Sequence, residues 1–238
     1  MWPICRRDLV QAFTTPLAWL VLACWTMLSN GLFVRTLHQV QGTSGSDAPL
    51  FVNAMALGVG ILTLLAPAIT MTAFSGERQQ GTMQLLMTVA RREHELVLGK
   101  FLAAWITLLS LVAATLIQPL VLMFVSQVNI PHLLSGYAGL VLICGFFAAL
   151  GVWISLIVDT PIAAYVITFA VVGILFLIGL GGEDGPLGLI AGKIGLGPRV
   201  GPFFRGEIRL GNVLYFCGAT AACLILAHGS LRARRIHG

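Results

Sequence analysis

The sequence predicts an all-α, polytopic membrane protein with six transmembrane helices, an N-terminal amphipathic helix and a cytoplasmic helix between the second and third spans. Hydrophobic residues occupy 58% of the 238 positions, charged residues occupy 10%, and the mean hydropathy is +0.93. A soluble core of this size needs far less apolar surface. The apolar segments are continuous rather than alternating, which argues against a transmembrane barrel.

Six apolar segments are long enough to cross about 30 Å of hydrocarbon at about 1.5 Å per helical residue. We place them near Leu17–Val34, Phe51–Phe74, Gly99–Val125, Leu133–Val158, Ile162–Gly181 and Gly211–His228. Pro67 in the second segment and Gln118-Pro119 in the third predict kinks, because proline lacks the N–H that a helix interior uses. Neighbouring helices are expected to bind the backbone groups that these prolines leave free.

Residues 2–13 predict a short helix at the membrane interface, and Thr15 and Pro16 then supply the N-cap and first-turn proline of the first span. Helical spacing places Trp2, Cys5, Leu9, Ala12 and Phe13 on one face, and Arg7, Asp8 and Gln11 on the other. A frayed basic tail that carries Arg6 and Arg7 is the alternative.

The distribution of positive charge predicts the orientation. Nine Lys and Arg residues fall at the chain ends and in the even-numbered loops, and five fall on the opposite side. The richer side belongs in the cytoplasm, so both termini and the Ser75–Lys100 loop are expected there. The net charge of +5 therefore reflects membrane topology rather than nucleic-acid binding. The first apolar run is a full span without a small-residue cleavage site, so no cleavable signal peptide is expected.

The insert after the second span, SGERQQGTMQLLMTVARREHELVLGK, is densely polar. Glu77 and Arg78 end the span, Gly81 breaks the helix, and Thr82 can cap a new helix over Met83–Thr88. This new helix carries apolar side chains at helical spacing. A rigidly held hairpin of this kind is suited to binding a cytoplasmic partner. Its apolar side chains can fill a groove of the partner, and its charges can fix the orientation of the complex. The residues alone leave an ordinary solvated loop equally open.

The stretch between the fifth and sixth spans, Gly182–Leu210, is too polar and glycine-rich to cross the membrane. Its apolar residues predict short helices on the outer interface. These residues are Leu187, Ile190, Ile194, Phe203 and Phe204.

Few polar side chains lie within the spans, and no charged residue is near a bilayer centre. This argues against an ion channel or a proton-coupled carrier. Thr70, Thr115 and Gln118 are the candidates for lining a pathway, with interhelical hydrogen bonding as the alternative. The five cysteines show no CxxC or metal-like spacing, so neither a disulfide nor a metal site is expected.

Two enzyme classes do not fit the motifs. The string closest to a phosphate-binding loop, LGLIAGKIG, has Leu187 in place of the first glycine and Ile194 in place of the hydroxyl residue. The chain is therefore not expected to hydrolyse ATP by itself. An intramembrane serine protease needs a glycine-flanked serine at mid-membrane and a histidine on a neighbouring span. Ser155 has no such flanks, and the histidines fall in loops or at helix ends.

Four stretches, in order along the chain, resemble the permease subunits of ABC type-2 exporters. GERQQGTMQLLMT with HELVLGKF is similar to a loop in the branch that includes the gliding-motility permease and the maturation permease of nitrous oxide reductase, a copper enzyme. RRDLVQAFTTPLAWL resembles the family's amphipathic elbow, GYAGLVLICGFFAALGVWIS its fourth span, and FFRGEIRLGNVLYF the start of its sixth. The chain departs from the usual pattern at Thr72, at Gly76 and at Ala90–Glu93.

The resemblance implies one permease domain over residues 1–238 that forms a translocation pathway as a homodimer in a bacterial inner membrane. It also implies two separate ATPase subunits, which bind ATP and Mg²⁺, whereas this chain binds no cofactor. The residues implied to couple to the ATPase are Glu77, Arg78, Gly81, Thr82, Leu85, Leu86 and Glu95. Those of the elbow are Trp2, Arg6, Arg7, Phe13 and Pro16. A periplasmic accessory subunit and the cargo remain open, and a non-transporting membrane scaffold is the alternative function.

Overall fold

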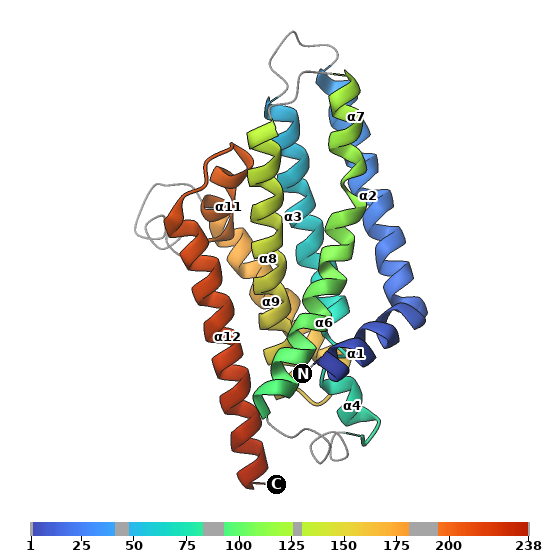
Figure 1. Cartoon of the computed structure of the whole chain (residues 1–238), viewed down its shortest axis with the longest axis vertical. Helices are drawn as coiled ribbons and strands as arrows, with labels where there is room; N and C mark the ends of the chain where they lie inside the picture. The colour runs from blue at the N-terminus through green and yellow to red at the C-terminus, as the bar shows by residue number, and fades with distance from the viewer. Residues whose placement is uncertain (1, 41–47, 83–92, 126–129, 181–194, 238) are drawn as a thin grey trace.

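The computed structural model describes residues 2–40, 48–82, 93–125, 130–180 and 195–237, and these residues form helices without any strand (Figure 1). The helices are α1 (Trp2–Thr14), α2 (Pro16–Val40), α3 (Ala48–Thr70), α4 (Ser75–Gln79), α6 (Glu93–Ala114), α7 (Ile117–Val125), α8 (Ile130–Ile157), α9 (Pro161–Leu180), α11 (Leu196–Phe204) and α12 (Leu210–His237). The all-α prediction is confirmed.

Six candidate membrane spans are present in the described part of the chain, as predicted. The second span runs from Val52 in α3 to Gln79 in α4, and the third joins α6 to α7. Both termini lie at the same end of the bundle, which follows from the even number of spans (Figure 1). The chain is a multi-pass membrane protein.

Helix α8 is the centre of the bundle. It is the most buried span, since 78% of the residues of Ile130–Ile157 are buried. The helices that pack against it are α3, α6, α9, α11 and α12. Its small residues permit this close packing. At Gly139 an added Cβ would lie 2.8 Å from Cβ of Phe203 on α11, and at Gly151 it would overlap the hydroxyl of Thr70 on α3. The spans α2, α9 and α12 are only 17–22% buried and therefore form the periphery.

The predicted kink in the third span is confirmed between Ala114 and Ile117, and neighbouring helices bind the freed carbonyls. Pro119 cannot donate to the carbonyl of Thr115, and the Tyr137 hydroxyl of α8 donates to it instead, at 3.0 Å. The carbonyl of Leu111, one turn earlier, accepts the indole N–H of the buried Trp25 at 2.6 Å. These two hydrogen bonds therefore attach α2 and α8 to the third span at its kink.

The segment between α9 and α12 differs from the prediction, which was that short helices lie on the outer interface. A short helix is present, but α11 packs between α8 and α9, and both Phe203 and Phe204 are buried. Glycines allow this insertion, because an added Cβ on Gly179 of α9 would lie 2.6 Å from the backbone nitrogen of Gly197. Leu187, Ile190 and Ile194 lie outside the described residues.

The contact between α3 and α8 gives a first prediction. Gly151→Ala should destabilise the bundle by about 1–3 kcal/mol, because the new methyl group overlaps Thr70 in a packed core. Thermal unfolding in detergent should show a lower midpoint for this variant. Gly173→Ala is the matched control, because no atom of the described residues lies within 4 Å of a Cβ there. Equal midpoints for the two variants would contradict the packing described.

Candidate functional site

The candidate site surrounds α4, where the second span ends on the side of the two termini (Figure 1). Glu77 and Arg78 lie in α4, and Glu95 lies in the first turn of α6. Leu85, Leu86 and the predicted helix Met83–Thr88 lie outside the described residues.

The N-terminus of α4 is capped by a serine from another helix. The chain turns through residues 71–74, and α4 then begins without a side-chain cap of its own. Ser155 of α8 fills this role: its Oγ accepts the backbone N–H groups of Phe74 at 3.0 Å and Ser75 at 3.1 Å. The same hydroxyl donates to the carbonyl of Met71 at 3.0 Å. First-turn N–H groups need such acceptors, so α8 stabilises the start of α4. Ser155, considered above only as a nucleophile, therefore has a structural role.

Arg78 makes the reciprocal contact, from α4 to the end of α8. Its guanidinium donates to the carbonyls of Leu156 at 2.8 Å and Val158 at 3.1 Å. It also pairs with Asp159 at 2.6 Å. The last carbonyls of a helix have no partner within the helix, and a basic side chain there also interacts favourably with the helix dipole. Arg78 thereby holds α4 against the short turn between α8 and α9.

A second set of contacts joins α4 to α1 and α6 through four charged residues, which we call the charge cluster: Arg7, Asp8, Glu77 and Lys100. Glu77 Oε1 accepts from Arg7 at 2.6 Å and lies 3.1 Å from Lys100 Nζ. Asp8 pairs with Lys100 at 3.1 Å through Oδ2 and with Arg7 at 2.8 Å through Oδ1. Two positive and two negative charges balance within the cluster.

Burial decides which of these pairs matters most. The Lys100 side chain is 3% exposed, whereas that of Arg7 is 49% exposed. Loss of one partner from a buried pair costs about 3–5 kcal/mol, whereas an exposed pair contributes at most about 1 kcal/mol. Lys100 also lies over the Phe74 ring, 5.1 Å from its centroid. Burial alone would lower the pKa of Arg7, but Asp8 and Glu77 raise it above its ordinary value.

Helix α1 is present as predicted, and most of its predicted apolar face lies inward: Cys5 is buried, and Leu9, Ala12 and Phe13 are half-buried. Two residues depart from the prediction. Asp8 lies in the charge cluster, whereas Trp2 is exposed. The helix packs mainly on α6, and the Lys100 ammonium attracts the Asp8 carboxylate inward. Spacing of apolar residues cannot indicate this, because the partner charge is 92 positions away. Arg6 is exposed.

The elbow between α1 and α2 is held by aromatic contacts. Trp19 donates its indole N–H to the carbonyl of Phe13 at 2.7 Å, and the two rings meet edge to face. Pro16 begins α2 as predicted. Thr15, predicted to cap α2, donates its hydroxyl backward to the carbonyl of Ala12 at 2.8 Å.

Gly81 and Thr82 end α4. Gly81 adopts the left-handed backbone conformation, with φ of 70°, that commonly ends helices. Thr82 donates both its backbone N–H and its hydroxyl to the carbonyl of Glu77, at 3.0 Å and 3.1 Å. The break predicted at Gly81 is therefore confirmed, whereas a cap by Thr82 on the next helix concerns residues outside the described ranges.

The three candidate pathway residues are buried within the single chain and hydrogen-bond to it. Thr70 donates to the carbonyl of Ala66 at 3.1 Å, and Thr115 donates to that of Val112 at 2.7 Å. Gln118 donates to Asn30 Oδ1 of α2 at 3.2 Å, a partner that the sequence did not single out. These contacts suit the alternative role that the sequence left open, which is hydrogen bonding within and between helices.

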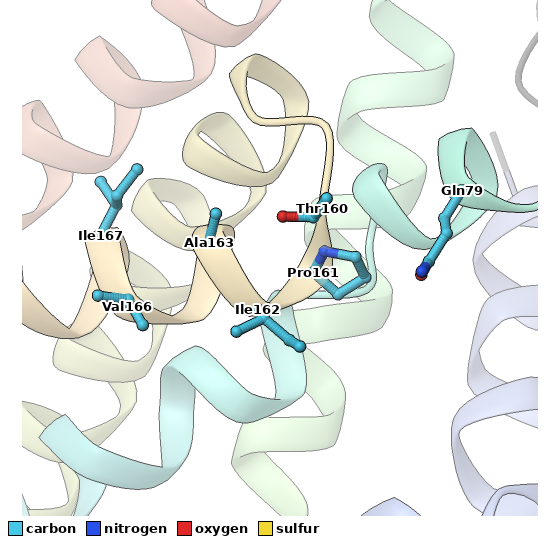
Figure 2. Close-up of a pocket in the computed structure, with 7 residues that line it drawn as sticks. All are labelled: Gln79, Thr160, Pro161, Ile162, Ala163, Val166 and Ile167. Carbon is cyan, nitrogen blue, oxygen red and sulfur yellow. The ribbon is translucent and has the colours of Figure 1, made fainter.

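A hollow of about 600 Å³ lies beside the contact between α4 and α8. Figure 2 shows Gln79 of α4 on one side of it, with Thr160, Pro161 and the first two turns of α9 on the other. The α9 wall is apolar and includes Ile162. Because α4 and α9 form opposite walls, a probe here reports their relative movement.

The comparison with known protein families settles the class of the chain. Residues 11–184 match the family described as ABC-2 family transporter protein, which is well over half of the 238 residues. The chain belongs to this family. It is thus a membrane permease component of an ABC transporter, a family whose permeases work with ATPase subunits. The match includes α4, the last four residues of α1 and the turn between α8 and α9. No curated protein showed a significant match.

The charge cluster gives a prediction that uses Cys5 as a reporter in a chain whose other four cysteines are alanine. Burial, and then the Asp8 charge, raises the pKa of the Cys5 thiol, so alkylation should be slow while α1 is docked. Lys100→Met leaves the Asp8 and Glu77 carboxylates with Arg7 as their only cation in the cluster, so α1 should detach more readily. Alkylation should then be about tenfold faster or more, since about 1.4 kcal/mol in the free energy of detaching α1 corresponds to a factor of ten.

Two adjacent arginines supply the controls for this experiment. Arg7→Gln should accelerate alkylation less than Lys100→Met, because Arg7 is half exposed. Arg6→Gln removes the same charge from an exposed position and should leave the rate unchanged. An unchanged rate in Lys100→Met would show that the cluster does not hold α1.

Proposed function

We propose that this chain is the permease subunit of an ATP-binding-cassette exporter and forms its translocation pathway as a homodimer coupled to two separate ATPase subunits. Family membership supports the permease role. The loop GERQQGTMQLLMT with HELVLGKF supports the gliding-motility and nitrous-oxide-reductase maturation branch. The excess of Lys and Arg beside the termini supports a bacterial inner-membrane protein with cytoplasmic termini. ATP and Mg²⁺ are bound by the ATPase partner.

The observation that carries this proposal is the way α4 is held on several sides at once. Ser155 and Arg78 join it to α8, and the charge cluster joins it to α1 and α6. A helix of five residues has little stability of its own. Held in this way, it moves with its neighbours rather than bending alone. A displacement applied to the loop that follows α4 is therefore passed into the bundle.

In our mechanism, each ATPase binds the Ser75–Lys100 loop, and closure of the two ATPases displaces α4. The charge cluster carries this motion to α6 and to the elbow, and Arg78 carries it to the turn between α8 and α9. The bundle then alternates between inward-open and outward-open states at the seam of the dimer. Energy enters only through the loop contact.

The proposal is tested first by purification of the tagged chain from its native host in mild detergent, with mass spectrometry and an ATPase assay. We expect an ATP-binding-cassette protein at about one copy per permease copy. Leu86→Asp should abolish the association, because it places a charge among the apolar side chains of the helix that the sequence predicts over Met83–Thr88. Ile208→Asp, an exposed site between α11 and α12, is the control and should retain the partner. A chain that purifies alone would instead favour a membrane scaffold.

The role of Arg78 gives a separate prediction. In the purified complex, a cysteine introduced as Ile162→Cys in the hollow of Figure 2 should react at different rates with and without ATP. Arg78→Gln should remove at least half of this difference while the ATPase stays bound, because the link from α4 to the α8–α9 turn is lost.

The matched control is Arg232→Gln, which removes an exposed arginine from α12, the last span. It should leave the ATP-dependent difference intact. A full difference in Arg78→Gln would show that motion reaches α9 by another route.

A further inference from the structure

One face of the first membrane span, α2, is largely uncovered in the described part of the chain. The helix lies at the edge of the bundle and packs mainly on α3, and its inward residues Trp25 and Phe33 are buried (Figure 1). At about 100° per residue, Met27 lies opposite Trp25, and its side chain is 80% exposed. The other residues on this side are exposed or half-exposed as well. We call the set the α2 face: Leu20, Ala23, Met27, Asn30, Gly31 and Val34.

Lipid is a poor cover for the α2 face. The spans α2, α9 and α12 are all peripheral, with only 17–22% of their residues buried. Among the candidate spans of the described chain, α2 has the lowest mean hydropathy, whereas α9 shares the highest with α8. A helix that meets only lipid tails is stabilised by apolar side chains, and α9 has that composition. The lower hydropathy of α2 therefore indicates that protein covers part of its exposed surface.

Asn30 is the polar side chain of the α2 face. It lies five residues before Arg35, where the span ends, and thus about 7 Å inside the span at about 1.5 Å per residue. Its Oδ1 accepts an N–H of Gln118 from α7 at 3.2 Å, whereas Nδ2 donates to no group in the described part of the chain. The side chain is half-buried, and the described residues do not enclose Nδ2. Lipid tails cannot accept these N–H groups, so a protein acceptor is favoured.

A second copy of the chain supplies this acceptor. A carboxamide has two N–H donors and an oxygen with two lone pairs, and Gln118 uses one lone pair of Asn30 Oδ1. In a two-fold dimer whose axis runs along the membrane normal, α2 can lie parallel to its own copy, so that the same face contacts itself. Each Asn30 Nδ2 then donates to Oδ1 of the other chain. The pair is reciprocal because the carboxamide is its own complement.

Gly31 permits the two helices to come close beside Asn30. An added Cβ at Gly31 would meet no atom of the described residues within 4 Å, so packing within the chain does not require a glycine there. Gly139 and Gly151, by contrast, are explained by their contacts with Phe203 and Thr70. Small residues let helix backbones approach closely in a membrane and bring polar side chains within hydrogen-bonding reach. A second copy of α2 gives Gly31 this role.

We propose that the α2 face is the contact between the two permease copies, with α2 packed in parallel against its own copy and the two Asn30 side chains hydrogen-bonded to each other. This inference names the surface of the homodimer in the proposed function and rests on that part of it. Through Gln118 the contact also reaches α7, the outer part of the third span. The inner part of the same span carries Lys100 of the charge cluster. Motion of the third span is therefore transmitted to the seam of the dimer.

Disulfide cross-linking in native membranes tests the contact, in a full-length chain whose own five cysteines are alanine. Oxidation with copper phenanthroline should link two copies of Met27→Cys. Leu28→Cys is the matched control, because Leu28 is also exposed but lies about 100° further around the helix. Met27→Cys should cross-link about tenfold faster or more, since a disulfide requires Cα atoms within about 7 Å of each other.

A second experiment measures the dimer directly, by energy transfer between labelled copies as the lipid-to-protein ratio of vesicles rises. Gly31→Leu should raise the dissociation constant about tenfold or more, because the new side chain separates the copies while it meets no atom of its own chain at Cβ. Asn30→Leu should raise it about threefold or more, through loss of the hydrogen-bonded pair. Gly218→Leu, at an exposed and equally open glycine of α12, is the control and should leave the dimer unchanged.

The failure of this inference is distinguishable from the failure of the proposed function. A normal dimer of Gly31→Leu, or equal cross-linking of Met27→Cys and Leu28→Cys, would overturn the α2 face and leave the homodimer intact. Dissociation by Gly218→Leu in place of Gly31→Leu would move the contact to α12. An unaltered chain that stays monomeric in the vesicles with its ATPase bound would overturn the homodimer, and the α2 face with it.

Discussion

The structure depends on the exchange of caps between α4 and α8. Ser155 accepts the first N–H groups of α4, and Arg78 donates to the last carbonyls of α8. Each helix end leaves backbone groups that must find partners, and here each end supplies what the other lacks. The interaction is mutual, so neither helix end can move without loss of both caps.

The charge cluster extends this connection to the first and third spans. Lys100 is almost completely buried, and it is tolerated there because Asp8 and Glu77 face it. Two helices that are far apart in sequence therefore dock on one ammonium group. Both cations contact the same oxygen of Glu77, and its other oxygen is buried without a hydrogen-bond partner among the described residues.

Family membership and geometry together explain why polar residues gather at one end of an otherwise apolar chain. An ABC transporter permease works with a partner that hydrolyses ATP outside the membrane. The spans pack mainly through apolar side chains. In the proposed complex, the end of the bundle with the termini binds the ATPase, and directional contacts hold α4 there. Charged and capping interactions provide direction because they have preferred geometry, and apolar contacts do not.

Sequence alone determined the six spans, the kink at Pro119 and the break at Gly81, because continuous apolar runs, proline and glycine act on the local backbone. It also singled out Glu77 and Arg78. Tertiary structure alone decided the partners of these two residues. Ser155 lies 80 positions from the turn it caps, and Asp8 turns inward toward a lysine 92 positions away. Local periodicity carries no information about such contacts, since they form only when distant helices pack together.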